Sequence, residues 1–192
     1  MSAALEARLA AIVRRTPGLM QVLRTARDLA LPDWMVFSGA VYQPVLNHIT
    51  GRPADHGLKD YDLAYHDASD LSYEAEDAVI RRAAEAFAPD LAPLVEVRNQ
   101  ARVHLWFAQK FGEGGYGPLG CSAEALLRFV SASFAVGVRL EPGDRLTVFA
   151  PFGLDDLFAL RLRPNPLRPT TGFARAAASV RARWPEVAVE LR

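Results

Sequence analysis

Residues 59–65 form an apolar, strand-like run that carries two acids, Asp60 and Asp62. Side chains at positions i and i+2 of a strand point to the same face of a sheet, so these two carboxylates are expected to project together. Two like charges on one face repel each other unless a cation lies between them. Mg²⁺ is commonly bound by one or two carboxylates together with substrate phosphates. For an isolated Asp-x-Asp the alternative is a solvated acidic face on an edge strand.

Length and charge restrict the possible functions. The chain has 192 residues, half of them hydrophobic, with 22 Lys and Arg against 22 Asp and Glu. This is enough to bury a substantial core in one ordinary domain with an extension, or in two small domains. A net charge of zero argues against broad electrostatic binding to nucleic acid, which needs a basic surface. A local basic pocket for a nucleotide remains compatible with it.

The N-terminal sequence and the cysteine content bear on location. The single cysteine, Cys121, cannot form an internal disulfide, which fits a reducing compartment. An early acid, Glu6, and the lack of a long apolar run argue against a signal peptide. No apolar stretch approaches transmembrane length. We therefore expect a soluble cytoplasmic protein without a membrane partner.

Two amphipathic helices are expected before the first strand. Apolar residues recur at helical spacing over residues 3–15 and again over 19–30. Thr16 is the expected N-cap of the second helix and Pro17 its first residue. We assign these helices a packing role, as a cover for one face of a sheet.

A short apolar run over residues 34–37 predicts a buried strand. It leads through Ser38, Gly39 and Ala40 into a predicted helix over residues 41–49. Such a strand, turn and helix can bind an anion, because glycine lets the backbone approach a phosphate and the helix offers free N–H groups. The same residues also fit a simple tight turn.

The later part of the chain supplies further strands and helices. In chain order these are a helix over residues 73–87, a strand over 94–97, a helix over 103–111, a short helix over 123–129, a hairpin of residues 133–140 and 145–149, and a basic helix over 173–184. The strand over 94–97 carries an acid, Glu96, between two valines. A lone acid in a strand usually lies on the solvent face, and here it is also a candidate third carboxylate.

Several stretches together resemble a known family. They are residues 37–40, 60–62, 97–104, 135–139, 150–157 and 163–166. With them the chain resembles the DNA polymerase beta-like nucleotidyltransferase superfamily and, within it, a bacterial nucleotidyltransferase-like family first catalogued as a domain of unknown function. The resemblance covers about residues 20–190. Its most specific parts lie within residues 99–104 and 153–157.

The resemblance implies an α+β fold, with a small mixed sheet of the polymerase-beta-like type covered by helices. We expect one nucleotidyltransferase-like domain over residues 1–192. It would consist of an N-terminal helical cover over 1–32, a catalytic-type core over 33–111 and a C-terminal hairpin and helix extension over 121–192.

The resemblance also implies a reaction. An enzyme of this kind transfers a nucleoside monophosphate from a nucleoside triphosphate to an acceptor hydroxyl, here on an unknown small molecule or protein. Asp60, Asp62 and Glu96 are then the catalytic residues and the ligands of two Mg²⁺ or Mn²⁺ ions. Glu96 would complete the metal on the nucleophile side and assist deprotonation of the acceptor. Two metals stabilise the charge that builds up on the attacking and leaving oxygens.

Candidate nucleotide contacts surround these acids. Ser38 and Gly39 are expected to hold the β- and γ-phosphates, with Lys59, Arg98 and Arg102 as further phosphate contacts. Structural roles are the alternative. In that case Lys59 is a solvated loop residue, and the two arginines pair with the acids when no metal is bound.

Asn99 and His104 are expected on the acceptor side. The alternatives are an N-cap role for Asn99 on the following helix and a satisfied helix-face position for His104. The phosphate turn departs from the superfamily pattern, which has Gly-Ser or Gly-Gly where this chain has Gly39 and Ala40. Phosphate binding would then rely on Ser38 and on backbone N–H groups.

Two alternatives to an active enzyme remain open on sequence grounds. One is a catalytically inactive nucleotide-binding or interaction module on the same fold. The other is a structural partner protein in which the acids are salt-bridged to Arg98 and Arg102. Base preference, acceptor and oligomeric state are not encoded in any recognisable pattern.

Overall fold

A mixed five-stranded sheet forms the centre of the protein, in a computed structural model that describes residues 2–112, 114–167 and 172–190. Its strands are β1 (Met35–Phe37), β2 (Tyr61–Tyr65), β3 (Val95–Asn99), β4 (Gly137–Leu140) and β5 (Leu146–Phe149), in the order β3-β2-β1-β4-β5. β2 and β3 are parallel, and the other neighbours are antiparallel. A second sheet pairs β6 (Arg161–Leu162) with β7 (Ala188–Val189). The predicted α+β fold with a small mixed sheet is confirmed.

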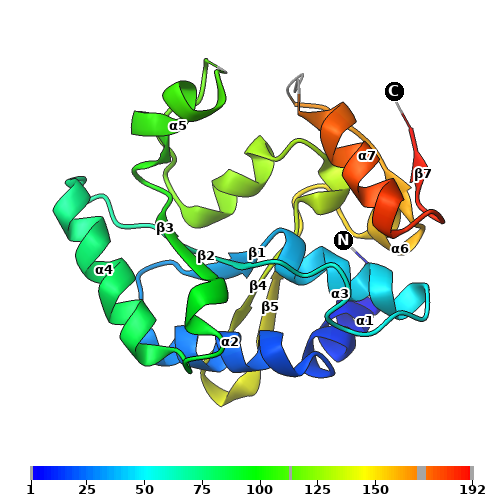
Figure 1. The fold of residues 1–192 in the computed structure, drawn as a ribbon, viewed down its shortest axis with the longest axis horizontal. Coiled ribbons are helices and arrows are strands. Elements are labelled where there is room, and N and C mark those ends of the chain that lie inside the picture. The colour runs from blue at the N-terminus through cyan, green and yellow to red at the C-terminus, as the bar shows by residue number, and fades with distance from the viewer. Residues whose placement is uncertain (1, 113, 168–171, 191–192) are drawn as a thin grey trace.

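Helices surround the central sheet (Figure 1). They are α1 (Ala3–Arg14), α2 (Pro17–Leu29), α3 (Gly39–Ile49), α4 (Tyr73–Ala86), α5 (Val103–Phe111), α6 (Asp155–Phe158) and α7 (Phe173–Arg183), with the 3₁₀ segments η1 (Ala92–Leu94), η2 (Ser122–Arg128), η3 (Ala132–Phe134) and η4 (Pro142–Asp144). α2 packs against β2 and β4. α5 and α7 lie above the sheet in Figure 1, on opposite sides of β1. None of the described helices has the length and hydrophobicity needed to cross a membrane.

The two faces of the sheet differ because side chains alternate along each strand. Leu63 and Val97 belong to the main core, which includes the buried residues of α2. The side chains of Asp62 and Ala64 point to the opposite face of the sheet. Ala64 packs with Leu126 of η2 in a second, smaller cluster. The acid of β2 therefore lies on the face that η2 partly covers.

Two elements differ from the sequence predictions. Residues 132–134 form η3 instead of the start of a strand, because Ser131 accepts a hydrogen bond from the backbone of Ser133 and Ser133 donates to the carbonyl of Arg161. The predicted short helix over 123–129 is the 3₁₀ segment η2. The predicted hairpin is present as β4 and β5, and β4 pairs with β1. Part of the C-terminal region thus builds the same sheet as the acids.

The C-terminal helix is fixed to the core by a buried tryptophan. Trp184 is fully buried, and its indole N–H donates to Oδ1 of Asn47 in α3 at 2.8 Å. The amide of Asn47 donates in turn to the carbonyls of Ala54 and His56. One polar group in α3 therefore holds both the end of α7 and the loop that leads to β2.

Candidate active site

Three neighbouring strands bring the predicted acids together. Asp62 of β2 is in register with Phe37 of β1 on one side and with Glu96 of β3 on the other. Residues directly opposite in neighbouring strands share a face of the sheet, so the side chains of Asp62 and Glu96 are neighbours. Asp60 lies immediately before β2, two positions from Asp62.

Burial and mutual repulsion dominate the electrostatics of these acids. Burial raises the pKa of Asp62 to about 7, and the charges of Asp60 and Glu96 add to this shift. A hydrogen bond from Ser38 and the positive charge of Arg98 act in the opposite direction. Burial, followed by the charge of Glu96, also raises the pKa of Asp60. Neighbouring carboxylates whose negative charges repel each other favour the binding of a cation, because the cation offsets that repulsion.

The acids do not form a closed metal site in the arrangement seen. Within the described ranges, no group of three or more His, Cys, Asp or Glu side chains is placed to hold a metal ion. Oε2 of Glu96 instead lies 3.8 Å from Nη2 of Arg98, and both side chains are about half exposed. Hard carboxylate oxygens are the ligands that Mg²⁺ prefers, and a cation relieves the repulsion that raises the pKa of Asp62. The chemistry of these three side chains therefore suits a divalent cation, while in this structure Glu96 lies near Arg98.

Ser38 joins the acids to the first turn of α3. It has φ 65° and ψ −138°, a conformation that residues other than glycine rarely adopt, and its N–H donates to the carbonyl of Val136. Gly39 and Ala40 are the first residues of α3, so their N–H groups have no partner within the helix. The side chain of Ala40 is buried in the core. The hydroxyl available at this turn is that of Ser38, as the departure from the superfamily pattern suggested.

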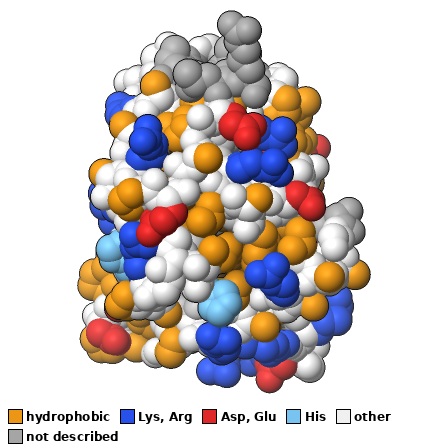
Figure 2. Space-filling view, turned by 90° about the vertical axis from the view of Figure 1, so that its right-hand side faces the viewer, with side chains coloured by type: hydrophobic (Ala, Val, Ile, Leu, Met, Phe, Trp, Pro, Cys, Tyr) orange, Lys and Arg blue, Asp and Glu red, His pale blue; other side chains and the backbone are white. Residues whose placement is uncertain are grey.

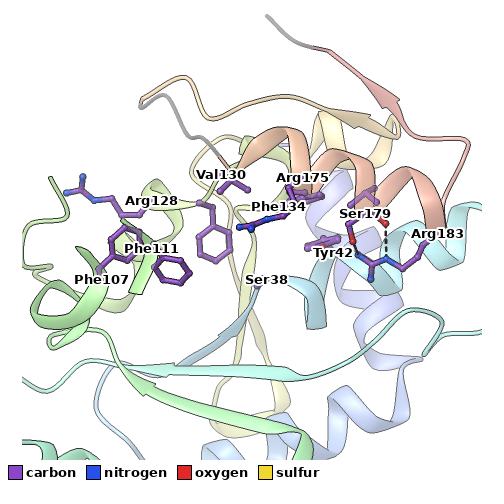
Figure 3. A pocket seen from close by; sticks show the side chains of 14 residues that line it. Ser38, Tyr42, Phe107, Phe111, Arg128, Val130, Phe134, Arg175, Ser179 and Arg183 are labelled. Atoms are coloured by element: carbon purple, nitrogen blue, oxygen red, sulfur yellow. Dashed lines mark hydrogen bonds between the residues drawn. The ribbon is translucent and has the colours of Figure 1, made fainter. Parts of the chain in front are cut away.

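A cavity of about 810 Å³ lies beside Ser38 (Figure 3). Its lining consists of Ser38, Tyr42, Phe107, Phe111, Arg128, Phe129, Val130, Phe134, Gly172, Arg175, Ala176, Ser179, Val180 and Arg183. These residues come from α3, α5, α7 and the segment that includes η2 and η3. The described lining contains three arginines and no acid, although the chain as a whole is neutral. Such a pocket suits a ligand that is both anionic and partly aromatic.

Sequence reasoning missed the contribution of α7 to this pocket. Arg175, Ser179 and Arg183 follow each other at intervals of four residues and therefore share one face of the helix. Among the described residues, neither Arg175 nor Arg183 forms an ion pair with an acid. The four-residue spacing in the sequence indicates a polar helix face. It does not indicate that this face packs beside Ser38.

Two of the three predicted phosphate contacts lie near the acids. The charge of Arg98 acts on Asp62, and the exposed Lys59 lowers the pKa of Asp60. Arg102 is buried, is paired with Glu76 of α4, and donates from Nε to the carbonyl of Leu71. The structure does not bring Arg102 to the acids, and none of these three residues lines the pocket.

The two predicted acceptor-side residues also lie outside the pocket lining. Asn99 is buried, and its side chain exchanges hydrogen bonds with the backbone of Asp67 and accepts one from the N–H of Ala101. It closes the turn after β3, while the N-cap position of α5 belongs to Arg102. His104 lies in the first turn of α5, and its Nδ1 is buried without a hydrogen-bond partner among the described residues.

The comparison with known families decides the classification. A family model described as nucleotidyltransferase matches residues 24–189. The chain belongs to this nucleotidyltransferase family. The matched segment includes all three acids, Ser38 and the pocket lining. The family resemblance predicted from the sequence is thereby confirmed.

A solved structure shows that the nucleotidyltransferase has a known fold. An NMR structure, described as revealing a CCA-adding enzyme head domain, matches with a TM-score of 0.76 at 21% sequence identity. The match covers 96% of this chain and 95% of that chain. A search of curated proteins gives no match.

Proposed function

We propose that this nucleotidyltransferase transfers a nucleoside monophosphate from a nucleoside triphosphate to an acceptor hydroxyl, with divalent metal bound by Asp60, Asp62 and Glu96. The observation that carries the proposal is the register of Asp62 with Glu96 beside the Ser38 turn. The adjoining pocket, with arginines and aromatic rings in its lining, gives the nucleotide a place to bind.

The chain's own residues have distinct roles in this proposal. Bound Mg²⁺ would supply charge stabilisation at the attacking and leaving oxygens. Ser38 and the free N–H groups of Gly39 and Ala40 would orient the phosphates at the positive end of α3. Glu96, the most exposed of the three acids, is placed to accept the proton of an acceptor that arrives from solvent. The protein thus contributes mainly positioning and electrostatics.

A small molecule or a protein is the acceptor we propose. The neighbour's description names CCA addition, but nucleic-acid substrates are usually bound by a strongly basic surface. This chain has zero net charge. Figure 2, which shows the side that carries α7, has basic, acidic and hydrophobic side chains on the same face.

A nucleotide-binding module without turnover is the second candidate. The pairing of Glu96 with Arg98, and the lack of a preformed metal group within the described ranges, favour it. In that case the pocket binds a nucleoside triphosphate but the acids do not promote transfer.

Pyrophosphate release tests the proposal. Each of the four nucleoside triphosphates is incubated with the protein, Mg²⁺ or Mn²⁺ and a heat-treated cell extract as the source of acceptors. We expect release with the wild type and its loss in Asp62→Asn and Glu96→Gln. Asp77→Asn, a surface acid of α4 paired with Arg81, is the control and keeps the activity. Binding without release supports the non-catalytic module, and release that survives in Asp62→Asn contradicts the proposed site.

A further inference from the structure

The pocket beside Ser38 has two lobes of different chemistry. Figure 3 shows Arg175 and Arg183 of α7 on one side of Ser38 and Phe107 and Phe111 of α5 on the other. The first is called the α7 lobe and the second the α5 lobe. Two of the three arginines of the lining therefore lie on the α7 side, whereas Arg128 lies with the α5 rings and its guanidinium stands over the ring of Tyr116.

The geometry points to a divided nucleotide site in which the α7 lobe binds the triphosphate and the α5 lobe stacks on the base. This assignment rests on the proposed function and deepens it. It places recognition of the leaving pyrophosphate on Arg175 and Arg183, in the C-terminal part of the chain. The C-terminal extension would then be part of the active site and not only a cover.

Arg183 is held in a defined orientation inside the α7 lobe. Its Nη1 donates to the carbonyl of Gly57 at 3.0 Å, and its Nε and Nη2 donate to the carbonyl and hydroxyl of Ser179 at 3.2 and 3.4 Å. Its charge and a hydrogen bond oppose the rise in pKa that burial causes at Tyr42. A guanidinium fixed in this way loses little freedom when it binds phosphate oxygens.

The position of Tyr42 connects this arginine to the phosphate turn. Tyr42 lies in the first turn of α3, and its N–H donates to the carbonyl of Ser38. Arg183 therefore acts at the same end of α3 that carries the free N–H groups of Gly39 and Ala40. Arginine, hydroxyl and helix N–H groups converge on one region, which suits a polyphosphate.

Arg175 extends the α7 lobe along the pocket. It lines the cavity, and among the described residues it has no hydrogen bond or ion pair. An arginine in a cavity wall that is not paired with an acid can offer its charge to a ligand. Arg175 and Arg183 lie about 12 Å apart along the helix, and their long side chains could reach different phosphates of one chain.

The α5 lobe offers stacking surface. The rings of Phe107 and Phe111 lie 4.8 Å apart, and Phe107 stacks on Tyr116 at 4.3 Å. Phe111 is half exposed, and of the nine residues of α5 only Val103 is buried. Aromatic side chains stack on any nucleobase and contribute about 1–3 kcal/mol per base. The exposed ring of Phe111 in the pocket lining thus offers a surface that a nucleobase could cover.

Calorimetric titration with three probes tests the two lobes separately. The probes are ATP, inorganic tripolyphosphate and adenosine, each in Mg²⁺, on the full chain. We expect Arg175→Gln and Arg183→Gln each to weaken the binding of ATP and of tripolyphosphate by about tenfold or more, since a charge-assisted hydrogen bond is lost. Adenosine binding stays unchanged. Arg175→Gln is the cleaner variant, because Arg183 also supports the loop at Gly57.

Two further variants complete the design. We expect Phe111→Ala to weaken the binding of ATP and adenosine, because both carry a base, and to leave the binding of tripolyphosphate unchanged. Arg181→Gln, an exposed arginine of the same helix outside the pocket, leaves all three probes unchanged. Unaltered tripolyphosphate binding in both Arg175→Gln and Arg183→Gln overturns the assignment, even if Asp62 proves essential for turnover. Loss of tripolyphosphate binding in these variants supports it, even if pyrophosphate release is never observed.

Discussion

Ser38 stands between the acids and the pocket, and its backbone is strained. A non-glycine residue at φ 65° and ψ −138° costs about 1–3 kcal/mol, and such strain often occurs at functional sites. The residue is serine, although glycine would fit this backbone conformation better. Its hydroxyl, which hydrogen-bonds Asp62, offers a reason.

Replacing this serine should separate stability from function. We expect Ser38→Gly to raise the free energy of unfolding by about 1 kcal/mol, because relief of strain exceeds the added entropy of the unfolded chain. The same change should weaken nucleotide binding, because a phosphate contact is lost. Urea unfolding and ATP titration measure the two effects. A variant less stable than the wild type would show that the conformation is not strained.

Asp62 should give the metal-free protein an unusual pH dependence. Its pKa is about 7 in the folded protein, above the ordinary 3.8, so the folded state holds the proton more tightly than the unfolded state. The contribution of Asp62 to the free energy of unfolding is therefore greatest below about pH 4 and is lost as the pH rises to about 7. Unfolding in EDTA at several pH values measures the slope.

The variant Asp62→Asn removes this titration. At pH 8 in EDTA it should be more stable than the wild type by on the order of 4 kcal/mol, since the pKa is raised by about three units and each unit corresponds to about 1.4 kcal/mol. At pH 4 the difference should nearly vanish. Asp77→Asn on α4 is the matched control and should show no such pattern. A less stable Asp62→Asn at pH 8 would mean that Asp62 is stabilised as an anion without metal.

At the scale of elements, Arg98 within β3 and Arg102 just after it have different environments. Arg102 and Glu76 form a pair less than a tenth exposed, and Glu76 also accepts from the N–H of Asn99. Arg98 and Glu96 form a longer contact in solvent. One pair ties α4 to the end of β3, and the other lies at the proposed site.

These environments predict opposite outcomes for two similar substitutions. Arg102→Ala leaves Glu76 buried without its partner and should cost about 3–5 kcal/mol of stability. Arg98→Ala should change stability by less than about 1 kcal/mol but alter pyrophosphate release. Denaturant unfolding and the release assay measure both. Equal destabilisation by the two variants would contradict this division.

Several elements were predictable because their signals are local. Thr16 and Pro17 mark the start of α2, and an apolar run that carries Asp60 and Asp62 two positions apart indicates β2 with its acid. The 3₁₀ segment η3 was not predictable, because it depends on side-chain hydrogen bonds such as that from Ser133 to the distant Arg161. The pocket was not predictable for the same reason, since Arg183 meets Gly57 only in the folded chain.

The stretches that carry the family resemblance prove to be partly scaffold. Asp156 pairs with Arg163, which joins α6 to the segment after β6. Asn165 donates to the carbonyls of Leu127 and Phe129 at 2.8 Å each and so holds the end of η2. These contacts support the pocket wall without entering it. The specific motifs therefore identified the family better than they identified the residues at its site.

At the scale of the whole molecule, the C-terminal region completes both the sheet and the pocket. Trp184 links α7 to α3 through Asn47. We expect Trp184→Phe to lose this hydrogen bond, to reduce stability by about 1–2 kcal/mol, and to weaken tripolyphosphate binding by displacing Arg183. The affinity for Mg²⁺ alone should not change, because the acids lie on and next to β2 and β3 and not on α7. Calorimetry with each probe separates the two, and an unchanged tripolyphosphate affinity would argue against coupling through α7.

The most direct test of the central claim is the metal dependence of nucleotide binding. Calorimetric titration of each nucleoside triphosphate into the full chain, in Mg²⁺ and in EDTA, requires no knowledge of the acceptor. The account predicts binding that is tight with Mg²⁺, weak in EDTA and no longer metal-dependent in Asp62→Asn. Absence of metal-dependent binding with all four nucleoside triphosphates, or unchanged metal dependence in Asp62→Asn, would contradict it.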